Sequence, residues 1–103
     1  MSNRGKFALL TLCVVDPQTV ENQRLSLSTV AAENIRAKRA RLRISQREAA
    51  GRAGVAPSVW SVIESGQRRL TLDDAWRVCD ALGMTMADLL DGAPKEARRA
   101  LAV

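Results

Sequence analysis

The chain has 103 residues, which is the size of one small domain with short appendages. Its 16 Lys and Arg residues outnumber the 11 Asp and Glu residues, and the net charge of +5 favours a polyanionic partner, nucleic acid before a membrane surface. The absence of His, the presence of only two Cys and the lack of a glycine-rich phosphate loop disfavour catalytic, zinc and nucleotide sites, so we expect no enzyme activity, no metal and no cofactor.

The sequence divides into three segments. Residues 1–28 form an N-terminal segment of distinct composition, residues 29–92 form a domain of short helices separated by Gly and Pro, and residues 93–103 form a tail. Pro94 opens this tail as a short helix, unless the tail is frayed. The predicted fold class is therefore mainly α: a compact bundle of four to five short helices with a possible N-terminal β-arm.

The N-terminal segment contains the apolar run Phe7–Val15, then the turn-forming pair Asp16–Pro17, then the alternating residues Arg24–Ser28. This pattern predicts either a β-hairpin arm or a disordered leader. An arm with a strand that is apolar on both faces needs cover from the helical domain or from a second subunit. The apolar run is too short to cross a bilayer and no signal-peptide cleavage site follows it, so we expect a cytoplasmic protein without a membrane contact.

The first helix of the domain is predicted to cover about residues 30–42, with Ser28 or Thr29 as its N-cap. Arg residues gather toward its end, where the helix dipole favours positive charge. Ser45 begins the second helix and is followed three residues later by Glu48, which is the spacing of a capping box.

Glycine and proline mark the later helices. Gly54 ends the second helix, and the third helix covers Pro57–Ser65 and stops at Gly66. The segments Thr71–Asp74 and Thr85–Asp88 have the form of capping boxes and predict two further helices. The connections between these helices are short, which predicts a compact domain.

The second and third helices have the composition of a helix-turn-helix. Such a pair crosses steeply, so it needs small residues at the crossing, a Gly in the turn and apolar side chains facing inward. The residues that meet these needs are Ala49, Ala50, Ala53, Gly54, Val55, Trp60 and Ile63. Trp60 and Trp76, both at apolar helix positions, are predicted to lie in the core. The third helix can then enter the major groove of DNA.

From about Ile35 to Leu90 the sequence resembles the lambda-repressor-like (Cro-type) helix-turn-helix family of bacterial and phage regulators. The resemblance is carried by Ile35, Arg39, Ile44, Ser45, Gln46, Ala50, Gly54, Val55, Ile63, Glu64, Ser65, Gly66, Arg68, Arg69, Leu82, Gly83, Asp88 and Leu89. It implies a transcriptional regulator that binds double-stranded DNA as a repressor, in the form of a homodimer or of cooperative copies on DNA. The sequence offers no evident site for a small-molecule ligand. Because the helical domain offers little spare apolar surface, residues 1–28 are expected to mediate self-association or to reach a neighbouring copy bound to DNA, without reading bases in the major groove.

The resemblance also implies roles for individual residues. The candidate DNA-binding residues are Gln46, Arg47, Pro57, Ser58, Val59, Ser61, Val62, Ser65, Gln67, Arg68 and Arg69. Gln46 contacts phosphate or supports the recognition helix Pro57–Ser65. The first residues of this helix read base edges, and the turn after it binds phosphate. Arg39 and Glu64 are expected to form a structural ion pair.

The recognition helix departs from the family pattern where bases are read. Pro57, Val59 and Val62 offer no side-chain hydrogen bond. Direct readout is then limited to Ser58, Ser61 and contact of apolar side chains with thymine methyl groups, and DNA shape supplies the rest. The alternative function is an antitoxin-like or adaptor module, in which the apolar surface of the recognition helix binds a polypeptide.

Overall fold

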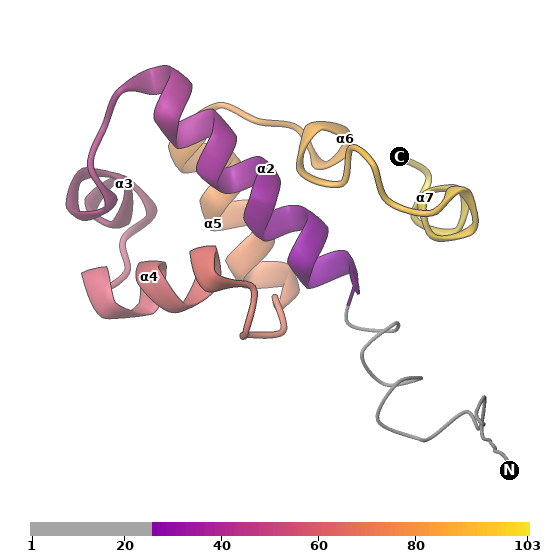
Figure 1. Cartoon of the computed structure of the whole chain (residues 1–103), viewed down its shortest axis with the longest axis horizontal. Coiled ribbons are helices and arrows are strands. Elements are labelled where there is room, and N and C mark those ends of the chain that lie inside the picture. Colours follow the sequence, from indigo (N-terminus) through magenta and orange to yellow (C-terminus); the bar gives the residue numbers. More distant parts are fainter. Residues whose placement is uncertain (1–25) are drawn as a thin grey trace, which may run out of the picture.

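The computed structural model describes residues 26–103 of the chain, and Figure 1 shows their arrangement. These residues form six helices, and no strand occurs among them. The helices are α2 (Ser26–Leu42), α3 (Gln46–Ala53), α4 (Pro57–Ser65), α5 (Leu72–Leu82), α6 (Met86–Leu89) and α7 (Lys95–Leu101). The predicted mainly-α fold class is confirmed, whereas the strand expected over Phe7–Val15 lies outside the described residues.

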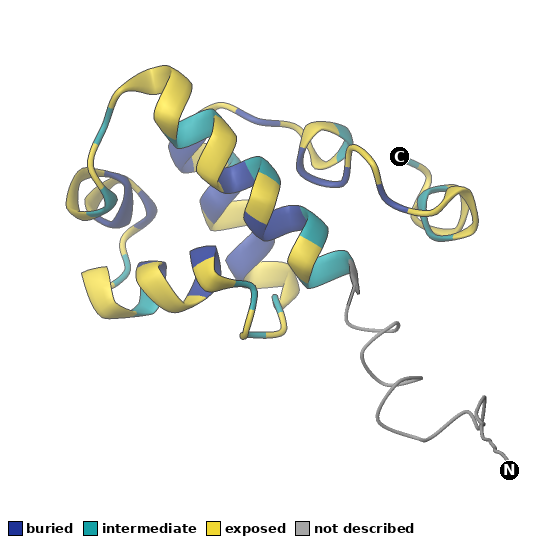
Figure 2. Cartoon of the chain, viewed as in Figure 1, coloured by how far each residue is buried: buried dark blue, intermediate teal, exposed yellow. Residues whose placement is uncertain are grey.

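The long helix α2 crosses the molecule, with α5 behind it, α3 and α4 toward one end and α6 toward the other (Figure 1). α3 packs on α4 and α5, and α2 packs on α4, α5 and α6. The largest fully buried side chains are Ile35, Trp60, Val78 and Leu89, one each from α2, α4, α5 and α6. Figure 2 shows buried residues along the inner sides of these helices. Helices α2 to α6 therefore pack around one shared core.

Side-chain caps position the starts of α3, α5 and α6. Thr71–Asp74 and Thr85–Asp88 are complete capping boxes, in which side chain and backbone exchange two hydrogen bonds. Ser45 caps α3 by accepting from the backbone N–H of Glu48 at 3.0 Å. The capping box predicted here is wrong, because the Glu48 side chain does not accept from the backbone N–H of Ser45. The Glu48 carboxylate instead accepts from Arg52, one turn further along α3, at 3.0 Å.

Two glycines end the central helices as predicted. Gly54 follows α3 with a φ of 72°, and Gly66 follows α4 with a φ of 78°. Only Gly adopts this left-handed conformation without a steric penalty, so it allows the chain to leave each helix sharply. Pro57 lies in the first turn of α4, where no backbone N–H is required.

Helix α2 begins earlier than the sequence suggested. The start predicted near Val30 is wrong, and so is the strand over Arg24–Ser28 for those of its residues that are described, because α2 begins at Ser26. Ser28, a predicted cap, lies inside the helix, and its hydroxyl accepts from the backbone N–H of Leu70 at 3.3 Å. The packing of α2 on α4, α5 and α6 thus prevails over a local alternating pattern that is typical of a strand.

Trp76 does not lie in the core, which corrects the prediction made for it. Its side chain is 59 % exposed, whereas Trp60 is fully buried. Ala75, Val78 and Leu82 share one face of α5 and are buried, while Trp76 lies one position further round the helix. α5 therefore has two neighbouring apolar stripes, and only one of them packs inside the domain.

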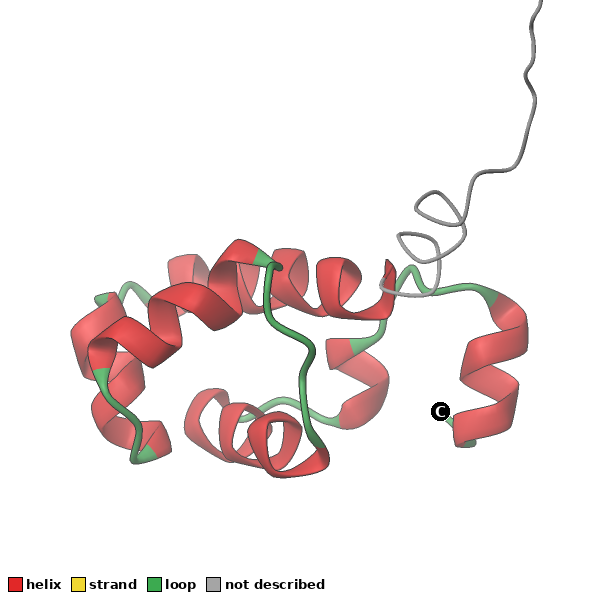
Figure 3. Ribbon diagram, turned by 90° about the horizontal axis from the view of Figure 1, so that it is seen from below, coloured by secondary structure: helices red, strands yellow, loops and turns green. Residues whose placement is uncertain are grey.

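The C-terminal tail forms a helix rather than a frayed end. α7 begins after Pro94 and stands apart from the other helices, as Figures 1 and 3 show. Short loops join the remaining helices (Figure 3). Within residues 26–103, no helix has both the length and the apolar character needed to cross a membrane.

Candidate nucleic-acid interface

α3 and α4 form a helix-turn-helix whose turn consists of residues 54–56. The residues buried where the two helices meet are Ala49, Ala50, Ala53, Trp60 and Ile63. The three alanines lack bulky side chains, so the backbones can approach each other closely. Val55, in the turn, is half-buried and packs on the same core. The turn and crossing residues identified in the sequence therefore lie together.

The opposite face of α4 is open to solvent. Its exposed residues are Pro57, Ser58, Ser61, Val62 and Ser65. Val62 is 43 % exposed and is the large apolar residue of this face. Val59 was expected to face outward with them, but it is half-buried and packs against the core. The reason is its position one helical turn before the buried Ile63, on the same side of α4.

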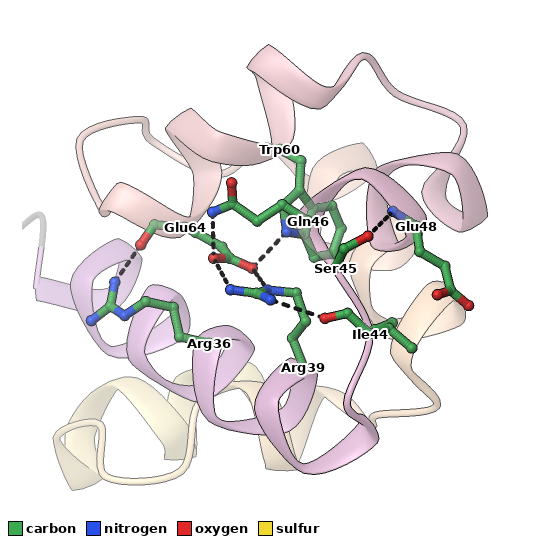
Figure 4. Close-up of polar contacts among 8 residues, drawn as sticks. All are labelled: Arg36, Arg39, Ile44, Ser45, Gln46, Glu48, Trp60 and Glu64. Atoms are coloured by element: carbon green, nitrogen blue, oxygen red, sulfur yellow. Dashed lines mark hydrogen bonds and ion pairs between the residues drawn. The ribbon is translucent and has the colours of Figure 1, made fainter.

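The carboxylate of Glu64 joins α4 to α2 and α3, as Figure 4 shows. Its Oε2 atom accepts from Arg39 Nε at 2.5 Å and from Trp60 Nε1 at 2.6 Å. Its Oε1 atom accepts from Arg39 Nη2 at 3.2 Å and from Gln46 Nε2 at 2.9 Å. Glu64 is only 3 % exposed, so these donors replace water around a buried charge. Arg39 and Glu64, for which an ion pair was expected, are thus in direct contact.

The protonation of Glu64 follows from these contacts. Burial alone would raise the pKa of this carboxyl group. The hydrogen bonds from Arg39, Gln46 and Trp60, together with the positive charge of Arg39, outweigh burial and hold the pKa of Glu64 below its usual value of 4.5. The group is therefore an anion at neutral pH, and it can hold its three donors at once.

Two guanidinium groups of α2 extend this attachment. Arg36 donates to the backbone carbonyl of Glu64, in the last turn of α4. Arg39 donates through Nη1 to the backbone carbonyl of Ile44 at 3.0 Å, in the loop that leads to α3. The C-terminal turn of α4 is therefore fixed to α2, to this loop and to α3. A helix held on one side and open on the other is suited to contact an external surface.

Gln46 and Arg47, at the start of α3, differ in their surroundings. Gln46 is half-buried, and its amide donates to Glu64, so this side chain is engaged with α4. Arg47 is exposed. It belongs to a group of exposed cationic residues along α2, α3 and the loop between them. This group consists of Arg36, Arg41, Arg43, Arg47 and Arg52.

Ser65 and Gln67, in the turn that follows α4, make local hydrogen bonds. The Ser65 hydroxyl donates to the backbone carbonyl of Val62 at 2.6 Å and accepts from the backbone N–H of Gln67 at 3.2 Å. Both residues are exposed. The serine therefore shapes the turn, and the side chain of Gln67 extends from it toward solvent.

Arg68 is paired with a buried carboxylate. Its Nε and Nη2 atoms donate to the two carboxylate oxygens of Asp74 at 3.0 Å and 3.1 Å. Asp74 is 7 % exposed, and burial alone would raise its pKa. Hydrogen bonds from Thr71 and Arg68 outweigh burial and hold the pKa of Asp74 below its usual value of 3.8. Only part of the Arg68 guanidinium is therefore left for a phosphate. The neighbouring Arg69 is exposed.

Three of these polar contacts were not identified from the sequence: those of Trp60 with Glu64, of Arg36 with Glu64 and of Arg68 with Asp74. Trp60 and Glu64 are one helical turn apart, and this spacing is a local pattern from which their hydrogen bond could be expected. The contact of Arg36 with Glu64 has no such pattern, because the two residues belong to different helices. Asp74 was identified as part of the cap of α5, but its pairing with Arg68 was not. In the part of the chain that the structure describes, no cluster of three or more acidic, His or Cys side chains could hold a metal ion.

No curated protein and no solved structure matches the chain. The family described as a helix-turn-helix domain matches residues 24–91, which is more than half of the chain. The matched stretch includes all of α2 to α6, and therefore the α3–α4 pair and the contacts of Glu64. The chain thus belongs to the helix-turn-helix domain family.

Proposed function

We propose that this protein is a transcriptional regulator of the lambda-repressor-like (Cro-type) kind, which places α4 in the major groove of double-stranded DNA. The observation that carries the proposal is the contrast between the two sides of α4. One side is fixed to α2 and α3 through the buried Glu64, and the other presents Ser58, Ser61 and Val62 to solvent. A recognition helix needs both properties, since base contacts require a helix that is exposed and held in one orientation.

The start of α4 supports an approach to the phosphate backbone. Ala56 is the N-cap residue and makes no side-chain hydrogen bond to the first turn. The backbone N–H groups of a helix's first turn have no partner within the helix, and the helix dipole there favours an anion. A phosphate next to the major groove would supply the missing acceptor.

Phosphate contacts are assigned to exposed side chains on either side of α4. Arg47 precedes α4 in the chain, and Gln67 and Arg69 follow it. Arg68, included with them on sequence grounds, is assigned mainly to holding the turn, because two of its donors bind Asp74. Contacts of this kind are made to any sequence, so they supply affinity and not specificity.

Direct base readout is assigned to the hydroxyl groups of Ser58 and Ser61 and to the apolar side chain of Val62. A hydroxyl group can form a hydrogen bond with more than one kind of base, and the isopropyl group of Val62 packs favourably against a thymine methyl group. These contacts discriminate less than a bidentate Arg or Asn contact, so DNA shape supplies part of the specificity.

The proposal includes a homodimeric repressor that acts in the cytoplasm without a cofactor, a metal, a small-molecule ligand or enzyme activity. Two copies related by a two-fold axis would place their recognition helices about one turn of DNA apart, ~34 Å. The alternative, an antitoxin-like or adaptor module, has less support, because Val59 packs on the core and leaves Val62 as the large apolar residue of the outer face of α4.

Selection of bound duplexes from a random library tests the proposal. The expected result is an enriched motif of two half-sites about one helical turn apart, bound roughly 10³-fold more tightly than scrambled DNA at physiological salt. The double variant Ser58→Ala with Ser61→Ala should lose discrimination and keep its affinity for scrambled DNA. If no motif is enriched and all duplexes bind alike, the protein is not a specific DNA reader, and the adaptor function is favoured.

A further inference from the structure

The outer face of α5 carries an apolar groove that the helix-turn-helix does not use. The groove has a volume of about 530 Å³, and it is lined mainly by Leu72, Trp76 and Cys79 of α5 and by Met86 of α6. Leu72 is 82 % exposed and Trp76 is 59 % exposed. Several large apolar side chains that gather in one open patch mark an interaction surface. The expectation that the helical domain has little spare apolar surface is therefore wrong.

This groove, here called the α5 groove, continues into a smaller one of about 140 Å³. The two share Leu72, Ala75 and Met86. The smaller groove is also lined by Leu27 and Ser28, in the first turn of α2. The apolar surface thus begins at the point where the N-terminal segment joins the described part of the chain.

We propose that the apolar run Phe7–Val15 of the same chain docks in the α5 groove. The run is apolar at every position except Thr11, so it has more apolar surface than a short segment in water can cover by itself. The groove likewise exposes apolar side chains to water. Both would remove apolar surface from water by this contact, which is the main driving force of association.

The connecting chain is long enough for this contact. Leu27 follows Val15 by twelve positions, and such a connection spans about 18 Å as a helix and about 40 Å when extended. α5 has eleven residues and is about 16 Å long. The run can therefore reach the whole groove from the α2 end. A short connection also creates a high effective concentration, on the order of millimolar, which favours the run of the same chain over that of a second copy.

Charges favour the same occupant. Arg4 and Lys6 immediately precede the apolar run, and Asp80 lines the α5 groove, with Asp73 exposed on the same helix. Arg77, the basic residue of α5, lies beside Gly54 at the end of α3 and does not line the groove. Cations that flank the apolar run thus meet carboxylates that flank the groove, at a surface where each pair contributes modestly.

The two cysteines of the chain provide the test, because Cys13 lies in the run and Cys79 lines the groove. The full chain at low concentration is treated with dibromobimane, which links two thiols only when they are adjacent. The expected product is a monomer in which Cys13 and Cys79 are joined, identified by its mass and by peptide mapping. Cys79→Ser removes the product and shows that the assay reports this pair.

Matched variants show whether the groove directs the link. The double variant Leu72→Ser with Trp76→Ser changes exposed residues, so the helical domain should stay folded by circular dichroism while the yield of linked monomer falls at least tenfold. Arg77→Ser, on the same helix but outside the groove, should leave the yield unchanged. The proposal is overturned if the groove variant links as well as the wild type, or if no linked monomer forms. It is also overturned if the product is a linked dimer whose yield rises with concentration, since a second copy then occupies the groove.

Discussion

The indole of Trp60 and the carboxylate of Glu64, one helical turn apart on α4, are joined by a hydrogen bond of 2.6 Å. Trp60 is fully buried and fills the core, and Glu64 binds Arg39 of α2 and Gln46 of α3. The residue that packs the domain therefore also orients the anion that holds the recognition helix. The packing of the core and the orientation of α4 are therefore coupled, so a substitution of Trp60 or of Glu64 should disturb both.

The first prediction concerns the stability of this contact. Glu64→Ala should lower the free energy of unfolding by about 3 kcal/mol, because it leaves the half-buried Arg39 guanidinium without its partner. The measurement is equilibrium unfolding in urea. Glu48→Ala is the matched control: it removes an exposed pair with Arg52 and should cost less than about 0.5 kcal/mol. Equal losses in the two variants would contradict the structural role of Glu64.

Stability should also depend on pH in the acid range. The pKa values of Glu64 and Asp74 are lower in the folded chain than their usual values of 4.5 and 3.8, so the unfolded chain takes up protons first as the pH falls. Their contribution to stability is present in full above these usual values and is lost as the pH falls through the folded values. The free energy of unfolding of the wild type should therefore be lower at pH 3 than at pH 6.

The variant Glu64→Gln tests the origin of this pH effect, since an amide cannot titrate. It should be less stable than the wild type at pH 6 and should lose less stability on going to pH 3. Asp74→Asn should behave in the same way, because its carboxylate is the partner of Arg68. If both variants show the same loss between the two pH values as the wild type, other carboxyl groups cause the effect.

Salt dependence separates the two arginines of the turn after α4. If Arg69 contacts a phosphate in each copy of a dimer, Arg69→Ala should reduce the slope of log affinity against log salt by about 2 for every DNA sequence. Arg68→Ala should lower stability and change the slope less, because its guanidinium is bound to Asp74. Arg99→Ala, on α7, is the control for the loss of one positive charge. An unchanged slope in the Arg69 variant would remove this residue from the interface.

The fold could be predicted where the determining contacts are local. The capping boxes Thr71–Asp74 and Thr85–Asp88 and the left-handed Gly66 are fixed by residues three or four positions apart, and they lie where the sequence indicated. The exposed position of Trp76 was not predicted, because it depends on how α5 is rotated against the rest of the domain. The Arg68–Asp74 pair was not predicted, because Arg68 was assigned to a phosphate contact. A helix with two apolar stripes gives no local indication of which stripe is buried.

The candidate site shows the same division. An ion pair between Arg39 and Glu64 followed from a family resemblance, and the two side chains are in contact. The inward orientation of the Val59 side chain was missed. A small rotation of a nine-residue helix about its axis decides whether a residue at the edge between its exposed and buried sides faces the core. This correction narrows the apolar outer face of α4 to Val62.

Val62 therefore gives the sharpest test of base readout. If its side chain contacts a thymine methyl group, replacing that thymine by uracil removes the methyl group and keeps every hydrogen-bonding atom of the base. The wild type should lose several-fold in affinity at that position, corresponding to about 0.8 kcal/mol for one buried carbon group. Val62→Ala should bind the thymine duplex more weakly and should be much less sensitive to the same replacement, because the partner of the methyl group is already gone.

The measurement is a set of binding titrations with thymine replaced at one position at a time. Ser65→Ala is the control, since its hydroxyl is engaged within the turn. A wild type that is indifferent to uracil at every position would show that α4 does not read thymine through Val62, and specificity would then have to come from Ser58, Ser61 and the shape of the DNA.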